Sequence, residues 1–366
     1  MKDKLTQSRL VELDSLRGIA AIGIVLWHFV AQFNATPFYF VFRPFYAGGL
    51  YLVDFFFLLS GFILAYTYLD KKKKISFSNL FIVRLIRLYP LHFVTLIVVL
   101  IQQLILTNFS NPSEFIYQYS NAKHFILNLF LINGVGVEDG FSFNGPAWAI
   151  STLFFVNILF FFVLTKIKNK KFFFVLLFLL PLIILLFTTR DLLIEQEIPF
   201  IGAELLRTML GFFAGVLLFL FAKKRDQNIN LSHSTLKNDL VFLLASLFLV
   251  IFMISGLRSV VGMDIVVACI VFPIVLLSSM RGGIIKEILT IKPLVYLGKI
   301  SFAIYMTHYP VQILFRIIET VFKFQFNYSS ASFFILVIAV TIIFADIAYR
   351  LVELPTRKLA KRVQEK

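Results

Sequence analysis

Cysteine is nearly absent from this sequence, since Cys269 is the single one among 366 residues. One thiol excludes an intramolecular disulfide and any metal site built from several cysteines. The histidines show no ligand spacing such as HExxH, and His92, His124 and His233 stand apart from one another. We therefore expect no metal site, and we expect Cys269, which lies in an apolar run, to belong to the core.

Charged residues are also scarce. They make up 15% of the chain, while hydrophobic residues make up 59%; typical soluble domains have about 25% and about 45–50%. The core of a single soluble domain is too small to bury this excess of hydrophobic residues. Apolar runs of about 20 residues recur, which is the length of a helix that crosses the hydrocarbon layer. We predict an all-α polytopic membrane protein whose residues 1–366 form a single integral membrane domain.

About ten transmembrane helices are predicted. They lie near residues 16–36, 47–69, 88–107, 147–165, 172–189, 203–222, 239–256, 261–280, 296–318 and 331–351. Residues 124–137 are too few for a full crossing and suit a re-entrant or interfacial helix better.

Basic residues decide the orientation of these helices. The net charge of +15 would suggest nucleic acid in a soluble protein, but here lysine and arginine cluster between apolar runs. If residues 124–137 do not cross, most of the basic residues fall on one side of the membrane. The positive-inside rule then favours ten spans with both termini cytoplasmic, membrane lipids as neighbours and no nucleic-acid partner.

Two ionisable residues lie inside the first two apolar runs. His28 is about 16 Å of helical rise beyond Arg17, and Asp54 in the second span is expected at a similar depth. A short connection makes these helices antiparallel neighbours, so we expect Asp54 to contact His28. A carboxylate at one ring nitrogen would make the other a better general base. A purely structural polar pair between two helices is the alternative.

Five separated motifs carry a family resemblance. They are ELDSLRGIAA followed by WHF at 12–29, GGLYLVDFFFLLSGFIL at 48–64, RLIRLYP at 84–90, LGKISFAIYMTHYPV at 297–311 and VELPTRK at 352–358. Together, and in this order, they resemble the membrane acyltransferase 3 family over nearly the whole chain. About 15 residues follow the last span, so we expect no C-terminal SGNH hydrolase-like domain of the kind that some relatives carry.

The resemblance implies the activity. It implies transfer of an acyl group, acetyl above all, from cytoplasmic acyl-CoA to a hydroxyl of a surface carbohydrate such as O-antigen or exopolysaccharide. It also implies a bacterial inner membrane and a glycan acceptor that is lipid-linked in some cases. His28 matches the family's acyl-transfer histidine, which would act as a base or carry the acyl group transiently.

Arginines are expected to hold the donor. Arg84 and Arg87 match the family's arginine pair, and guanidinium groups suit the phosphates of acetyl-CoA. Arg17 resembles the family's essential arginine, and Arg17 and Asp14 are both expected to face the same cytoplasmic vestibule, with Asp14 lining the cavity. Anchoring to lipid phosphates is the alternative for the pair, and a salt bridge at the helix start is the alternative for Arg17.

Later motifs suggest residues that line a cavity. Ser301, Tyr305 and His308 share one helix face, and Ser301 and His308 match family positions; a hydrogen-bonded structural cluster is the equal alternative. Trp148 lies in a segment, NGPAWAIS, that resembles the family's loop before a span. Many relatives have a glutamate five residues after the tryptophan, whereas this chain has Leu153.

That missing carboxylate suggests a different acceptor or a charge supplied elsewhere, for which Glu204 is a candidate. Glu353 and Pro355 match the closing signature, and we interpret them as structural. Gly18, Gly61 and Gly298 form no phosphate-binding loop and are expected to permit close helix packing.

Two other functions fit the same residues. The acceptor could be a small secreted molecule or a lipid head group. A proton-coupled transporter could use His28, Asp54 and His308 as a relay, but the sequence shows no matching pair of broken helices in two halves. The acyl chain length and the oligomeric state are left open.

Overall fold

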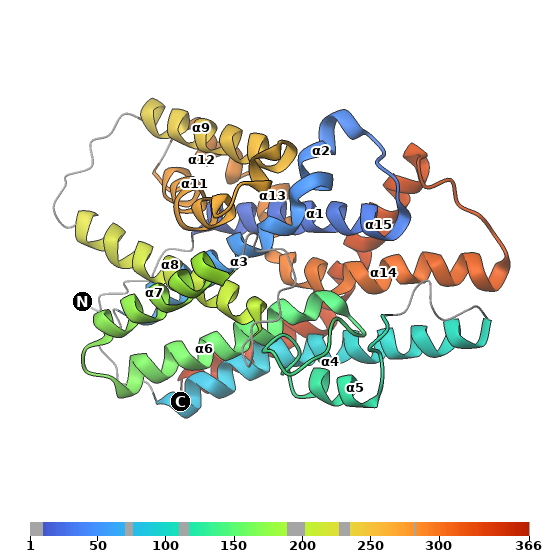
Figure 1. Cartoon of the computed structure of the whole chain (residues 1–366), viewed down its shortest axis with the longest axis horizontal. Helices are drawn as coiled ribbons and strands as arrows, with labels where there is room; N and C mark the ends of the chain where they lie inside the picture. The colour runs from blue at the N-terminus through green and yellow to red at the C-terminus, as the bar shows by residue number, and fades with distance from the viewer. Residues whose placement is uncertain are drawn as a thin grey trace.

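The computed structural model describes residues 10–69, 76–109, 117–188, 202–226, 235–281 and 283–365. Within these ranges the regular elements are all helices, as predicted (Figure 1). The α-helices are α1 (Val11–Phe33), α2 (Tyr39–Gly48), α3 (Leu52–Tyr68), α4 (Phe77–Phe109), α5 (Ala122–Leu129), α6 (Trp148–Lys166), α7 (Lys170–Thr188), α8 (Ala203–Asp226), α9 (Thr235–Ile254), α10 (Met263–Val266), α11 (Phe272–Ser279), α12 (Ile284–Leu289), α13 (Lys292–Lys299), α14 (Ser301–Phe322), α15 (Ala331–Ala348) and α16 (Leu354–Glu365).

Short helical turns of other types join several of these helices. The 3₁₀ turns are η1 (Gly49–Tyr51), η3 (Gly145–Ala147) and η4 (Gly256–Ser259), and the π-helical turns are η5 (Val267–Val271) and η6 (Tyr349–Glu353).

Eight helices of the described chain are long and apolar enough to cross a membrane, judged by length and composition. Two of the ten predicted spans are not among them. Residues Met263–Ser279 form a shorter apolar helix. The other, α14, has 22 residues, but His308, Gln312 and Arg316 lower the mean hydropathy of its middle. The count of ten and the cytoplasmic termini stay predictions.

The segment 124–137, predicted not to cross the membrane, contains most of α5. This helix has eight residues, which gives a length of about 12 Å. It is followed by a non-helical stretch in which Leu131 and Gly134 have positive φ angles. A helix of that length is too short to cross the membrane, as predicted.

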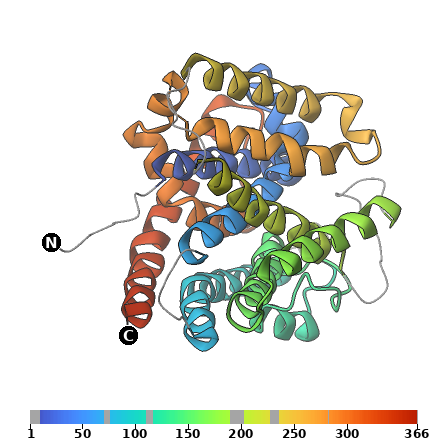
Figure 2. The ribbon, with the colours of Figure 1, turned by 90° about the vertical axis from the view of Figure 1, so that its left-hand side faces the viewer.

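Helix α14 packs between α1 and α4, and α3 packs along α8. The C-terminal helix α16 packs against α4, so the last part of the chain lies beside a helix from its first third (Figures 1 and 2). Around α3, side chains from several helices form the main core, which includes Phe57, Phe62, Phe160 and Phe212.

Glycines allow close contact in two helix pairs, α3 with α8 and α1 with α13, as predicted. A Cβ atom on Gly61 would collide with the Phe212 carbonyl of α8. Gly18 of α1 and Gly298 of α13 face each other, and a Cβ on Gly298 would collide with the Asp14 backbone. Small residues therefore let these helix backbones touch.

Two helix boundaries differ from prediction and move site residues. Helix α4 begins at Phe77, so Arg84 and Arg87 lie inside it, two to three turns from its start. The predicted span 296–318 is broken at Ile300, whose backbone ends α13 before α14 begins at Ser301. His308 therefore lies two turns into a separate helix.

Candidate functional site

One pocket gathers residues from both ends of the chain. It is lined by residues of α1, α3, α4, α6, α14, η6 and α16. Its polar lining consists of Arg17, Ser60, Arg84, Arg87, Tyr305, Glu353 and Arg357.

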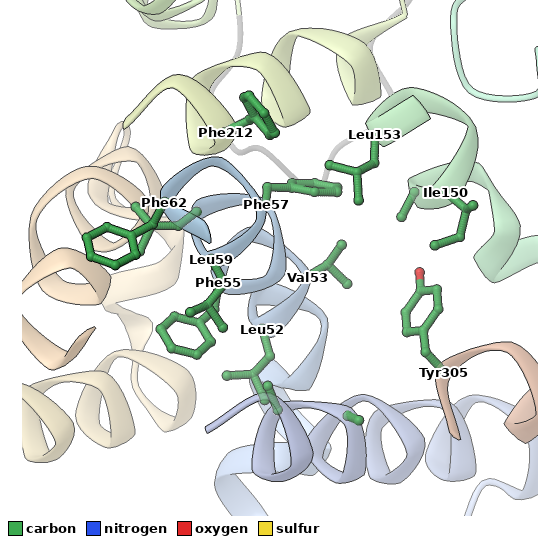
Figure 3. Packing of buried hydrophobic residues seen from close by; sticks show 14 of the residues in the cluster. Leu52, Val53, Phe55, Phe57, Leu59, Phe62, Ile150, Leu153, Phe212 and Tyr305 are labelled. Carbon is green, nitrogen blue, oxygen red and sulfur yellow. The ribbon is translucent and has the colours of Figure 1, made fainter. Parts of the chain in front are cut away.

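The remaining wall of this pocket is apolar. Val53 and Phe57 come from α3, Ile150 and Leu153 from α6, and the Tyr305 ring from α14 closes another side. Figure 3 shows these side chains around a shared space, with the Tyr305 hydroxyl directed into it. The pocket thus combines cations with an apolar surface.

The charge of the pocket is strongly positive. Four arginines face one carboxylate, Glu353, which is buried and paired with Arg357. Arg17 lies 3.9 Å from Asp14, and an Arg84 guanidinium nitrogen donates to Asn157 Oδ1 at 3.5 Å. Such an excess of guanidinium groups suits a ligand with several negative charges.

The three arginines expected to bind the donor are therefore brought together. Arg84 and Arg87 stand one turn apart and both line the pocket, so the predicted shared face is confirmed. Arg17 reaches the same pocket from α1.

Two residues of this pocket are not predicted from the sequence to bind a ligand. Glu353 is interpreted there as structural and Arg357 only as part of a basic tail, yet both line the pocket. Their spacing of four residues on a helix was the available signal, because it places the two side chains on one face.

Two histidines form the second part of the site. The His28 and His308 rings lie 4.7 Å apart, centroid to centroid. His28 Nδ1 donates to the Ile24 carbonyl at 3.1 Å, and His308 Nδ1 donates to the Tyr305 carbonyl at 2.6 Å. A carbonyl only accepts, so both rings carry hydrogen on Nδ1 and present Nε2 as an acceptor.

The position of Asp54 differs from the expectation. Its two carboxylate oxygens accept from the Arg207 guanidinium at 2.6 and 2.8 Å, and His308 is the ionisable side chain packed on His28. Both partners of the ion pair are buried. The two buried charges offset each other, and α8 supplies the cation.

Trp148 supports this ion pair. The Arg207 guanidinium lies 5.7 Å from the centre of the Trp148 ring, and Phe57 packs against the ring from another direction. Trp148 thus contacts the ion pair, and its neighbours Ala149 and Ile150 line the pocket.

Tyr305 connects the pocket with the histidine pair. It lines the pocket, its hydroxyl donates to the Pro146 carbonyl at 2.8 Å, and its ring centroid lies 5.8 Å from that of His308. The predicted common face of Tyr305 and His308 is thereby observed. Ser301, the first residue of α14, is buried, and its hydroxyl has no hydrogen-bond partner within the described residues.

Leu153 stands where many relatives have a glutamate, and Glu204 is the candidate to replace that charge, but the two residues do not line the same pocket. Leu153 lines the pocket, whereas Glu204 lies in the first turn of α8 and is not among the pocket residues. The carboxylate that shares the pocket with Leu153 is Glu353.

His92 and His124 lie outside both the pocket lining and the histidine pair. His92 is buried and donates to the Asn128 carbonyl at 2.8 Å. His124 accepts from the Asp139 backbone, and Lys123, which donates to the Asp139 carboxylate at 2.7 Å, holds the pKa of that carboxyl below its usual range. His233 lies outside the described residues. In the part of the chain that the structure describes, no three histidine, cysteine or acidic side chains gather at one point.

Comparison with known families gives one match over nearly the whole chain. The acyltransferase 3 family model, described as an acyltransferase domain, matches residues 10–350. Searches among curated proteins and among solved structures return no match.

Proposed function

Because this chain belongs to the acyltransferase 3 family, we propose that it transfers an acetyl group from cytoplasmic acetyl-CoA to a hydroxyl of a cell-surface carbohydrate. The observation that carries the proposal is the arginine-lined pocket whose Tyr305 also packs on the histidine pair. Family membership and eight long apolar helices indicate an integral membrane acyltransferase. We place it in a bacterial inner membrane with both termini cytoplasmic.

The donor's charges match the pocket. Coenzyme A carries several phosphate charges, and Arg17, Arg84 and Arg87 supply guanidinium groups from two helices. The apolar wall around Phe57 and Ile150 then receives the less polar arm that ends in the thioester. Arg17 and Arg357 come from opposite ends of the chain, so a pocket open to the cytoplasm accords with cytoplasmic termini.

His28 is the proposed base. Its Nδ1 hydrogen is held by the Ile24 carbonyl, so Nε2 has the lone pair that a base needs. The acceptor oxygen attacks the thioester carbonyl carbon while Nε2 takes the hydroxyl proton. The carbon–sulfur bond breaks, and the proton passes to the leaving sulfur, which gives an ester and free coenzyme A thiol.

The test measures thiol release from acetyl-CoA by the protein in nanodiscs, with a cell-surface glycan extract as acceptor. We expect the extract to stimulate release in the wild type. His28→Ala should lower the rate by about 10²- to 10⁴-fold, the range of general acid–base catalysis, while coenzyme A binding is retained. Thr341→Val, which alters a buried hydroxyl bonded within α15, is the control. Full turnover by His28→Ala would contradict the assignment, and proton flux without thiol release would favour a transporter.

A further inference from the structure

Two buried amide side chains, Gln312 and Asn144, lie near the histidine pair. Gln312 is fully buried, and its Nε2 donates to the Val25 carbonyl of α1 at 3.3 Å. Since a carbonyl cannot donate, this contact fixes which end of the amide is nitrogen. The other end, Oε1, is buried without a hydrogen-bond partner among the described residues.

Asn144 repeats this arrangement from another element. Its Nδ2 donates to the Met306 carbonyl of α14 at 3.1 Å. Pro310, four residues further along α14, has no N–H to donate to that carbonyl, so Asn144 takes over the missing helical bond. Asn144 Oδ1 is buried and, within the described part of the chain, lacks a donor.

Both amides lie close to the histidines. Gln312 follows His308 by four residues, which makes them neighbours on one face of α14. The carbonyl that Gln312 contacts belongs to Val25, three residues before His28 on α1. Asn144 precedes Pro146, whose carbonyl accepts from Tyr305 one turn before His308.

His308 adds a further acceptor. With its Nδ1 hydrogen used by the Tyr305 carbonyl, Nε2 is buried and has no donor within the described residues. Three buried lone-pair groups therefore lie on α14 or on the segment that contacts it, in the neighbourhood of the His28–His308 pair. Buried acceptors are almost always paired in folded proteins, because an unpaired one loses its hydrogen bond to water.

We propose that Gln312, Asn144 and His308 bind the acceptor through several of its hydroxyl groups and so present one further hydroxyl to His28. A ligand that satisfies acceptors must bring donors, and a polyhydroxylated sugar brings neighbouring O–H groups. Phosphate and thioester oxygens only accept hydrogen bonds, so these parts of the donor cannot satisfy the three groups. The inference rests on the proposed function and names the acceptor side of the same site.

The test separates acceptor binding from donor binding. Thiol release is measured in nanodiscs at varied concentrations of a cell-surface glycan extract and, separately, of acetyl-CoA. Gln312→Met removes the amide at nearly constant shape, and Asn144→Leu does the same for the second amide. We expect each to raise the half-saturating glycan concentration about tenfold, with the half-saturating acetyl-CoA concentration unchanged.

Gln103→Met is the matched control. Gln103 is also buried, but its amide donates to Ser120 Oγ in the segment before α5. This variant should leave both half-saturating concentrations unchanged. Periodate cleaves neighbouring diols, so treating the extract with it should raise the half-saturating glycan concentration of the wild type. The same treatment should have a smaller effect on the half-saturating concentration of Gln312→Met.

The outcomes are distinguishable. If the extract fails to stimulate the wild type, the proposed function itself fails, and this inference fails with it. If the wild type is stimulated and both folded variants keep its half-saturating glycan concentration, water rather than the acceptor satisfies these groups and the inference is overturned. Should one variant not fold, judged by its thermal unfolding midpoint and coenzyme A binding, the other decides alone.

Discussion

At the scale of single residues, the histidine pair and the buried ion pair have separate surroundings. His28 packs against His308, while the Asp54 carboxylate is held by Arg207, which also lies over the Trp148 ring. Asp54 therefore neutralises a buried cation between α3 and α8. The tautomer of His28 is set by the Ile24 carbonyl instead.

Asp54→Asn is expected to act mainly on stability. Removing one partner of a buried ion pair leaves the other charge uncompensated, which costs about 3–5 kcal/mol. The thermal unfolding midpoint should fall, and the double variant Asp54→Asn with Arg207→Gln should recover part of the loss. If Asp54→Asn unfolds like the wild type yet loses thiol release, Asp54 acts on the reaction directly.

At the scale of helices, close backbone approach holds α3 against α8. Gly61 lies against the Phe212 carbonyl, and Gly215 of α8 lies equally close to the Leu58 carbonyl of α3. Asp54 and the pocket residues Val53 and Phe57 lie on the α3 side of this interface. Arg207 lies on the α8 side. The ion pair and part of the pocket wall thus depend on one helix interface.

Gly61→Ala tests this interface. The added methyl group would collide with the Phe212 carbonyl, so the helices must separate, at a cost of about 1–3 kcal/mol. We expect a lower thermal unfolding midpoint and weaker coenzyme A binding. Gly256→Ala is the matched control, because nothing lies within 4 Å of a Cβ atom there. Equal midpoints for the two variants would contradict the close packing.

At the scale of the whole molecule, the pocket exists because distant parts of the chain converge. Arg17 comes from the first described helix, Arg84 and Arg87 from α4, and Arg357 from the last helix. Their like charges repel one another, and the carboxylates of Glu353 and Asp14 offset this repulsion only in part. A polyanionic donor would relieve this repulsion on binding, so affinity should decrease as salt screens the charges.

Arg87→Gln should raise the half-saturating acetyl-CoA concentration about tenfold or more. Hydrogen bonds to charged groups contribute roughly 1.5–3 kcal/mol, and each 1.4 kcal/mol is about a factor of ten. Arg350→Gln is the control, since Arg350 is mostly exposed, pairs with Asp346 and lies outside the pocket lining. An unchanged value for Arg87→Gln, or an equal effect in both variants, would argue for lipid anchoring instead.

The sequence by itself determined the helical membrane class, the shared face of Arg84 and Arg87, that of Tyr305 and His308, and the close packing at Gly61 and Gly298. Each follows from composition or from helical spacing, which are local properties. Only the tertiary structure decided that Asp54 pairs with Arg207, 153 positions away, and that Glu353 and Arg357 join the arginine pocket. Such pairings depend on how far each helix is rotated and shifted against its neighbours. Packing across the whole bundle sets those rotations, and no single segment contains them.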